Sequence, residues 1–109
     1  MIFRFNLKKK EIDTEAAVSF WKWFQENETR IKGRCLCDVR NLEHEIAGQL
    51  RAVFSYFGGS FEVHIGISEG RGELFLFHGG DRHLARDSEK LGELMPADLR
   101  SRWRFVVGR

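Results

Sequence analysis

The sequence has few of the residues that cross-link, break or anchor a chain. It contains two cysteines and one proline, and its apolar runs are far shorter than the ~20 residues that a membrane-spanning helix needs. Cys35 and Cys37 are separated by one residue, so a disulfide between them would be strained. Acidic residues, rather than an apolar segment with a cleavage site, follow the lysines at 8–10, so we expect no signal peptide. These features predict a protein of the reducing cytoplasm.

An excess of either charge is also missing. Eighteen lysine and arginine residues against sixteen acidic residues give a net charge of +2, and the two signs are interspersed. This balance argues against a protein whose overall field attracts nucleic acid or a membrane surface. What the chain does have is a hydrophobic fraction of 42% and a length of 109 residues, which is enough for one folded core. We therefore expect a single domain over residues 1–109.

The densest apolar stretch is Phe20–Phe24, in which four of five residues are aromatic. Asp13 is suited to cap a helix that contains this stretch, runs to about Ile31 and ends at Gly33. Each aromatic side chain can bury ~150–250 Å². At about 100° per residue most of them share one face, but Trp21 falls at its margin, so the apolar arc is wider than one packing seam needs. The excess width predicts an exposed aromatic anchor on this helix.

Periodic patterns predict the other elements. Alternating stretches indicate strands, apolar residues at steps of three and four indicate helices, and Gly, Asp or Pro residues mark their ends. The expected elements are a strand at residues 2–7, a connector at 34–37, a helix at 39–57 capped by Asp38, a hairpin at 61–67 and 73–78, a helix from Asp81 to Pro96, and a strand at 102–107.

In chain order these elements run strand, helix, helix, hairpin, helix, strand. Right-handed crossovers around one hairpin then predict an α+β fold. Its specific form is a ferredoxin-like four-stranded antiparallel sheet with helices on one face, in the order β-α-α-β-β-α-β. The second helix is an addition to the first crossover of that plan.

No catalytic or metal-binding constellation stands out. No serine lies in a nucleophile motif, and acids two positions apart on a helix do not face each other, so we expect no enzyme. Cys35, Cys37 and His44 could bind a metal, but a structural zinc site needs a second ligand pair, and two reduced thiols are the favoured interpretation. The Gly79–Asp81 turn could present amides to a phosphate, but no phosphate-binding fingerprint accompanies it, and Asp81 would itself cap those amides. We expect no cofactor.

Three segments together resemble an uncharacterised family of small bacterial proteins. They are the helix motif F-W-x-W-F-x-x-N-E at Phe20–Glu28, the strand Glu73–His78 followed by a Gly-Asp turn, and W-x-F at Trp103–Phe105. The resemblance covers most of the chain from residue 20 onward and departs at Met95–Pro96, where Ala-Pro is common in the family. It implies a single compact domain and transfers no catalytic residues.

The leading functional hypothesis is a non-catalytic protein-binding module. One form of it, by analogy with small bacterial inhibitors, is an immunity protein that neutralises a cognate toxin by stoichiometric binding. The expected partner-binding residues lie on or beside the aromatic helix: Trp21, Gln25, Glu26 and Glu28.

The alternative hypothesis is an RNA- or DNA-binding domain with a C-terminal arginine edge. Its expected contact residues are Arg100, Arg102 and Arg104. Phe75 and Phe77 could add base stacking on such a sheet, although the sequence motif of RNA-binding sheets does not match. A third hypothesis places a small ligand at the Gly79–Asp81 turn, where it predicts a concave pocket.

Overall fold

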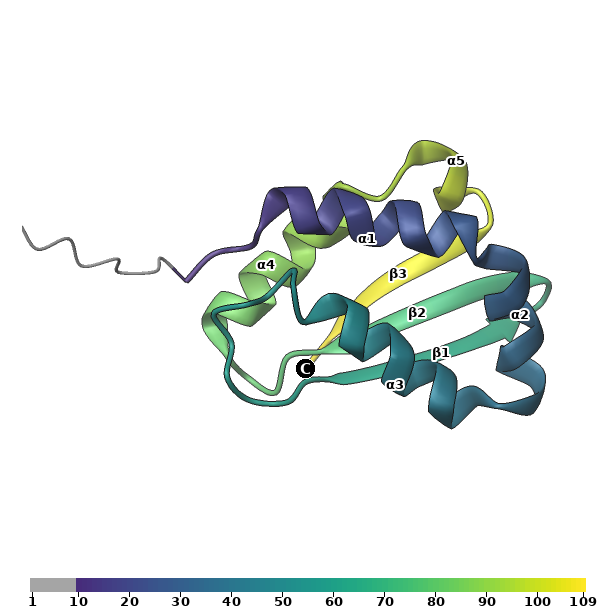
Figure 1. Cartoon of the computed structure of the whole chain (residues 1–109), viewed down its shortest axis with the longest axis horizontal. Coiled ribbons are helices and arrows are strands. Elements are labelled where there is room, and N and C mark those ends of the chain that lie inside the picture. The colour runs from purple at the N-terminus through teal and green to yellow at the C-terminus, as the bar shows by residue number, and fades with distance from the viewer. Residues whose placement is uncertain (1–9) are drawn as a thin grey trace, which may run out of the picture.

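The structure, a computed structural model, describes residues 10–109 (Figure 1). The strand expected at residues 2–7 lies outside the described residues. Within them the elements follow in the order α1 (Thr14–Glu26), α2 (Glu28–Cys37), α3 (Val39–Leu50), β1 (Glu62–Ser68), β2 (Arg71–Phe77), α4 (Arg82–Glu93), α5 (Ala97–Arg100) and β3 (Trp103–Gly108). The hairpin, the helix after it and the last strand are confirmed, with bounds that differ by a few residues.

The sheet differs from the predicted one. Among residues 10–109 it has three strands in the order β1-β2-β3, with β1 antiparallel to β2 and β2 parallel to β3. The prediction of a four-stranded, fully antiparallel, ferredoxin-like sheet is therefore wrong. The crossover through α4 brings β3 directly against β2, which leaves no place for another strand between them, and a crossover of this kind gives parallel pairing.

The hydrophobic core packs against one face of the sheet. The register places Ile65 opposite Leu74 on β2, and Leu74 opposite Phe105 on β3, so these side chains point to the same side. The buried residues of the three strands all belong to this set: Val63, Ile65, Gly72, Leu74, Leu76 and Trp103. The helices cover this side, and the alternate residues of each strand point to the other.

The helix that was predicted to run from Asp13 to about Ile31 is two helices. Asp13 caps α1 as expected, because its side chain accepts a hydrogen bond from the Ala16 amide. The break falls at Asn27, whose side-chain Nδ2 donates to the carbonyl of Trp23 at 2.8 Å. The predicted stop at Gly33 is wrong, since α2 continues through it to Cys37 and includes the predicted connector.

The third helix is shorter than predicted. It ends at Leu50, and residues 51–56 form turns instead of two further helical turns. Asp38 occupies the N-cap position, but its side chain makes no capping bond and contacts Arg34 and Asn41 instead. The buried residues of this segment still follow the predicted stripe, from Leu42 to Phe54.

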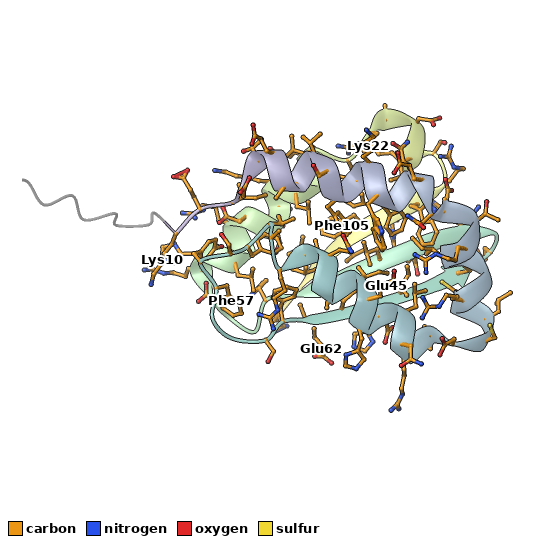
Figure 2. All side chains as sticks on the ribbon, viewed as in Figure 1. Lys10, Lys22, Glu45, Phe57, Glu62 and Phe105 are labelled. Carbon is orange, nitrogen blue, oxygen red and sulfur yellow. The ribbon has the colours of Figure 1, made fainter. Side chains whose placement is uncertain are left out.

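The aromatic residues of α1 pack in the centre of the core. The ring of Trp21 lies edge-on to Phe105, with centroids 5.6 Å apart, and Phe24 lies edge-on to Trp103 at 4.9 Å. Figure 2 shows Phe105 between α1 and the sheet. Trp21 is 1% exposed, and its indole Nε1 donates to the carbonyl of Leu91 on α4 at 2.9 Å. The wide apolar arc exists because α1 packs against both α4 and the sheet.

Candidate functional site

The four predicted partner-binding residues do not form one surface. Trp21 is buried, so the prediction of an exposed aromatic anchor at this position is wrong. Glu28 is mostly enclosed, Gln25 is half-buried, and only Glu26 is exposed. The last turn of α1 therefore presents polar atoms without an aromatic centre.

Glu28 joins α2 to the last strand. Its carboxylate accepts hydrogen bonds from Arg102 at 2.7 and 2.9 Å and from the Trp103 indole at 3.0 Å. The bond from Arg102 outweighs the opposing effect of burial and holds the pKa of Glu28 below its usual value. A carboxylate engaged in this way stabilises the fold and is not free for a partner.

The arginines of the predicted nucleic-acid edge are all bound within the chain. Arg100 donates to carbonyls at the end of α4, namely those of Gly92, Glu93 and Met95. Arg102 holds Glu28 and Asp98, and Arg104 pairs with Glu73 at 2.7 Å. Backbone and carboxylate oxygens of the protein thus occupy the groups that phosphates would need.

A buried carboxylate that the sequence reasoning missed joins α4 to the turn before β1. Asp87 is fully buried and accepts hydrogen bonds from Tyr56 at 2.7 Å and from Arg86 at 2.8 and 3.0 Å. Burial opposes its charge, but the bonds from Arg86 and Tyr56 lower the pKa of Asp87 overall. Burial also raises the pKa of Tyr56, with the bond to Asp87 adding to the effect. The signal in the sequence was an acid three positions after Leu84 on the apolar stripe of α4.

The Gly79–Asp81 turn reverses the chain after β2 and caps α4. Asp81 caps α4 through a bond from the Leu84 amide at 2.9 Å, and Gly80 donates its amide to the His78 ring at 3.0 Å. Both glycines have positive φ, 64° and 90°, which side chains disfavour. The amides of Gly80 and Leu84 are therefore already bonded within the chain.

Residues that could carry metal or thiol chemistry are dispersed. Among residues 10–109 no three His, Cys, Asp or Glu side chains are grouped so that they could hold a metal ion. Cys35 and Cys37 lie on α2, and burial, with a smaller effect of Glu43, raises the pKa of the Cys35 thiol. In the same range no helix has the length and apolar character to cross a membrane.

The side of the sheet that faces away from the helices carries an aromatic cluster. Phe75 and Phe77 of the central strand stack with their rings 7° from parallel and centroids 6.3 Å apart, and His64 of β1 lies edge-on to Phe77 at 5.4 Å. Gly108 lies beneath the Phe77 ring, where a Cβ would come within 2.5 Å of it. Both phenylalanines are half-buried although no described helix packs on this side.

We call this side of the sheet the aromatic face. The register places on it Glu62, His64, Gly66, Ser68, Arg71, Glu73, Phe75, Phe77, Arg104, Val106 and Gly108. Its polar groups have partners: Arg104 pairs with Glu73 at 2.7 Å, the His64 ring lies 3.0 Å from the Glu62 carboxylate, and Arg71 donates to the Arg100 carbonyl at 3.0 Å. The arrangement is an apolar centre bordered by charges that already have partners.

Sequence reasoning noted Phe75 and Phe77 but did not identify this face. The segment of β2 is apolar on both sides, as expected of a central strand, so its pattern does not show which side the helices cover. Only the position of the helices shows which of its two sides stays open.

Comparison with known proteins adds no further assignment, since no family model, no curated protein and no solved structure matches the chain significantly.

Proposed function

We propose that this chain is a non-catalytic protein-binding module and that the aromatic face is its contact surface. The observation that carries the proposal is the stacked pair Phe75 and Phe77, half-exposed on a sheet face that no described helix covers. Exposed aromatic clusters with polar borders are typical of interface centres, where aromatic residues are enriched. This proposal moves the expected surface from α1 to the opposite side of the molecule.

The charges of this face favour a protein over a nucleic acid. Glu62 and Glu73 supply two carboxylates, and Arg71 and Arg104 supply two guanidinium groups, so the two signs are balanced on this face. Nucleic-acid binding depends on cations that are free to neutralise phosphates. Of the two arginines here, Arg104 is bound to Glu73, and Arg71 donates to the carbonyl of Arg100. Stacked rings bordered by balanced charges fit an apolar protein surface better than a strand of nucleotides.

Specifically, we propose that the chain is a stoichiometric inhibitor in the bacterial cytoplasm, of the kind that immunity proteins represent. Its support comes from the sequence, through the resemblance to a family of small bacterial proteins and through two cysteines between which a disulfide would be strained. Such a protein would form a complex of one copy with one target and would need no cofactor.

The test is capture of a partner on the tagged full chain from nuclease-treated bacterial lysate, washed at about 1 M salt, where the Debye length is only ~3 Å. We expect one protein retained in a one-to-one ratio, and at least tenfold less of it on the double variant Phe75→Ala/Phe77→Ala. Phe57→Ala, which alters a half-buried phenylalanine outside the aromatic face, is the matched control. Equal retention on the wild-type chain and on the double variant would refute the proposal. So would a parallel capture without nuclease at low salt that recovers nucleic acid alone, if high salt then removes it.

A further inference from the structure

A groove runs between β3 and α4. Two adjoining hollows, of about 550 and 590 Å³, share Glu89 and Val107 in their walls. The wall on β3 also includes Phe105, and the wall on α4 also includes Ala85 and Gly92. The groove thus follows the outer edge of the sheet along most of the length of β3.

The backbone of β3 is unpaired on the side of the groove. The Gly72 amide donates to the carbonyl of Arg102 at 3.0 Å, which sets the phase of the parallel ladder. In that phase Phe105 and Val107 direct their N–H and C=O groups away from β2. Neither residue has another backbone partner within residues 10–109, and both are half-buried rather than enclosed. They form a short, accessible template for one more strand.

The opposite edge of the sheet is protected in a way that this one is not. On β1 the outward amide of Ile65 donates to the carboxylate of Glu43 from α3 at 3.0 Å, so a side chain occupies the position that a pairing strand would take. No side chain of residues 10–109 does the same for Phe105 or Val107. Because folded proteins cover or pair their sheet edges, the outer edge of β3 is where a further segment is expected.

The charges of the groove do not select its occupant. Arg71 and Arg100 line the same hollow as Glu89 and Glu93, and within residues 10–109 none of the four takes part in an ion pair. The two signs therefore cancel, and segments of either charge are tolerated alike. The choice of occupant depends on position and on sequence pattern instead.

The first segment of the chain ends at this groove. Arg86, which lines one of the two hollows, donates to the carbonyl of Lys10. Figure 1 shows α1 beginning at the end of the sheet where β3 terminates. Nine residues precede Lys10 and reach ~30 Å when extended, whereas the six residues of β3 span ~20 Å. The segment is thus tethered at one end of the groove and is long enough to follow the whole of β3.

Tethering favours this segment over any occupant that binds from solution. A segment joined through a short linker has an effective concentration in the millimolar range. A second copy or another protein present at about 1 μM would have to bind ~1,000-fold more tightly to compete equally with it. Position therefore selects the first residues of the chain itself, which charge alone does not.

The sequence of this segment is suited to an added strand. Phe3, Phe5 and Leu7 alternate with Arg4 and Asn6, and the segment contains no proline. Such alternation is typical of a strand with one apolar side. Successive side chains of a strand point to opposite faces, so the apolar set would pack beneath α4 while the polar set would face the other side of the sheet.

We propose that residues 2–7 bind in the β3–α4 groove of their own chain as an added strand parallel to β3. The direction follows from the tether, since Arg86, which holds Lys10, lines the hollow that contains Gly108 at the end of β3. Main-chain bonds to Phe105 and Val107 would hold the segment. This pairing is not the ferredoxin-like one, whose strands are all antiparallel. The inference goes beyond the proposed function: the chain fills its own groove, and a partner is left with the aromatic face.

The test is amide hydrogen exchange of the purified full chain, followed residue by residue by NMR. We expect the Phe105 and Val107 amides to exchange at least tenfold more slowly than in an unstructured chain. Mass action separates the occupants, because an intramolecular strand gives the same protection at about 10 μM and about 1 mM protein. Less than tenfold protection would leave the edge open and refute the inference. Protection that grows with concentration would assign the edge to a second copy and refute it as well.

The alternation is tested by two double variants of the full chain. Phe3→Ser/Phe5→Ser should speed the exchange of the two outward β3 amides at least tenfold, because the apolar set no longer holds the segment in the groove. Arg4→Ser/Asn6→Ser, the matched control, should leave it within threefold. Equal effects of the two variants would contradict the inference. If the first variant does not fold, nuclear Overhauser effects between residues 2–7 and β3 in the native chain decide, and their absence refutes it.

The edge itself is tested by Val107→Pro, which removes an outward N–H that β2 does not use. Proline is tolerated at an open edge, whereas here the lost N–H would pair with the added strand. We expect the Phe105 amide to exchange at least tenfold faster in the proline variant and within threefold of wild type in Val107→Thr, which keeps the N–H. Unchanged exchange in the proline variant would show that no strand pairs there. The same nuclear Overhauser effects decide if the proline variant does not fold.

Failure of this inference and failure of the proposed function give different results. Partner capture that depends on Phe75 and Phe77, combined with unprotected Phe105 and Val107 amides, would keep the protein-binding function and reject the added strand. Protected amides in a chain that captures no protein would support the added strand and reject the proposed contact surface.

Discussion

Glu28 shows at the scale of single residues how one carboxylate joins segments far apart in the chain. It holds Arg102 through two hydrogen bonds and Trp103 through a third, so that α2 is fixed to the start of β3. We expect Glu28→Gln to lower the free energy of unfolding by about 1–3 kcal/mol, because charged hydrogen bonds are lost and Arg102 keeps one partner fewer. Urea denaturation measures it. Glu26 is exposed, and its side chain makes no hydrogen bond or ion pair within residues 10–109, so Glu26→Gln should change the free energy of unfolding by no more than about 0.5 kcal/mol.

Protonation of Glu28 and Asp87 should also lower the stability of the fold. The pKa values of Glu28 and Asp87 are lowered in the fold from ordinary values of 4.5 and 3.8. Between the ordinary and the lowered pKa the unfolded chain binds more protons than the folded one, so the stability that is present above pH 4.5 is lost as the pH falls through the lowered values. We expect a lower urea midpoint at pH 3 than at pH 7. Asp87→Asn should flatten this dependence, and a wild-type midpoint that rises on acidification would contradict the assignment.

Substitution of Trp21 tests whether its side chain belongs to the core. Trp21→Ala should cost about 3–5 kcal/mol, because a buried indole is removed and its cavity is lined by α4 and β3. Val18, on the same helix, is 53% exposed, and Val18→Ala should change the free energy of unfolding by no more than about 0.5 kcal/mol. Thermal and urea unfolding of the two variants provide the comparison. Similar losses for both would place Trp21 outside the core.

Local signals were reliable for residues whose role depends on their neighbours in sequence. Asp13 and Asp81 cap helices as predicted, since a cap needs only the amides two or three positions ahead. Asp38 failed as a side-chain cap because Arg34 and Asn41 compete for its carboxylate. Asp87 was missed because Tyr56, which donates a hydrogen bond to it, lies 31 positions away in the sequence.

At the scale of elements, β2 and β3 are joined by a close approach that only glycine permits. A Cβ on Gly72 would lie 2.2 Å from the Trp103 ring, whereas a Cβ on Gly66 of β1 would meet nothing within 4 Å. We expect Gly72→Ala to destabilise the protein by at least about 1–3 kcal/mol, because the ring must leave its place or the strands must separate. Gly66→Ala is the matched control within the same sheet. Equal unfolding free energies for the two variants would refute the close approach.

The elements themselves were largely readable from periodicity, but their ends were not. Strict alternation found β1, and steps of three and four found the buried stripe of α3. The break at Asn27 was invisible because the apolar stripe continues to Ile31, and the break depends on a side-chain bond to Trp23. Gly33 carried the expected stop signal, yet α2 passes through it, since packing of Ile31 and Cys35 favours a longer helix.

At the scale of the whole molecule, the pairing of β3 decided both the fold and the candidate site. Local patterns show that a segment is a strand, but not which neighbour it pairs with or in which direction. The parallel pairing of β2 with β3 therefore contradicted the antiparallel plan. The aromatic face depends on the same fact, because Arg104 and Val106 reach Glu73 and Phe75 only when β3 lies beside β2.

The position of β3 also has a consequence for the order in which the chain assembles. The two strands of the hairpin are adjacent in sequence and need only a short loop to meet, whereas β3 reaches β2 only after α4 has closed a long loop. We expect stopped-flow refolding to show the hairpin formed before Trp103 settles over Gly72. Trp103 would then report the final step, at which its ring meets Phe24 and joins α1 to the last strand.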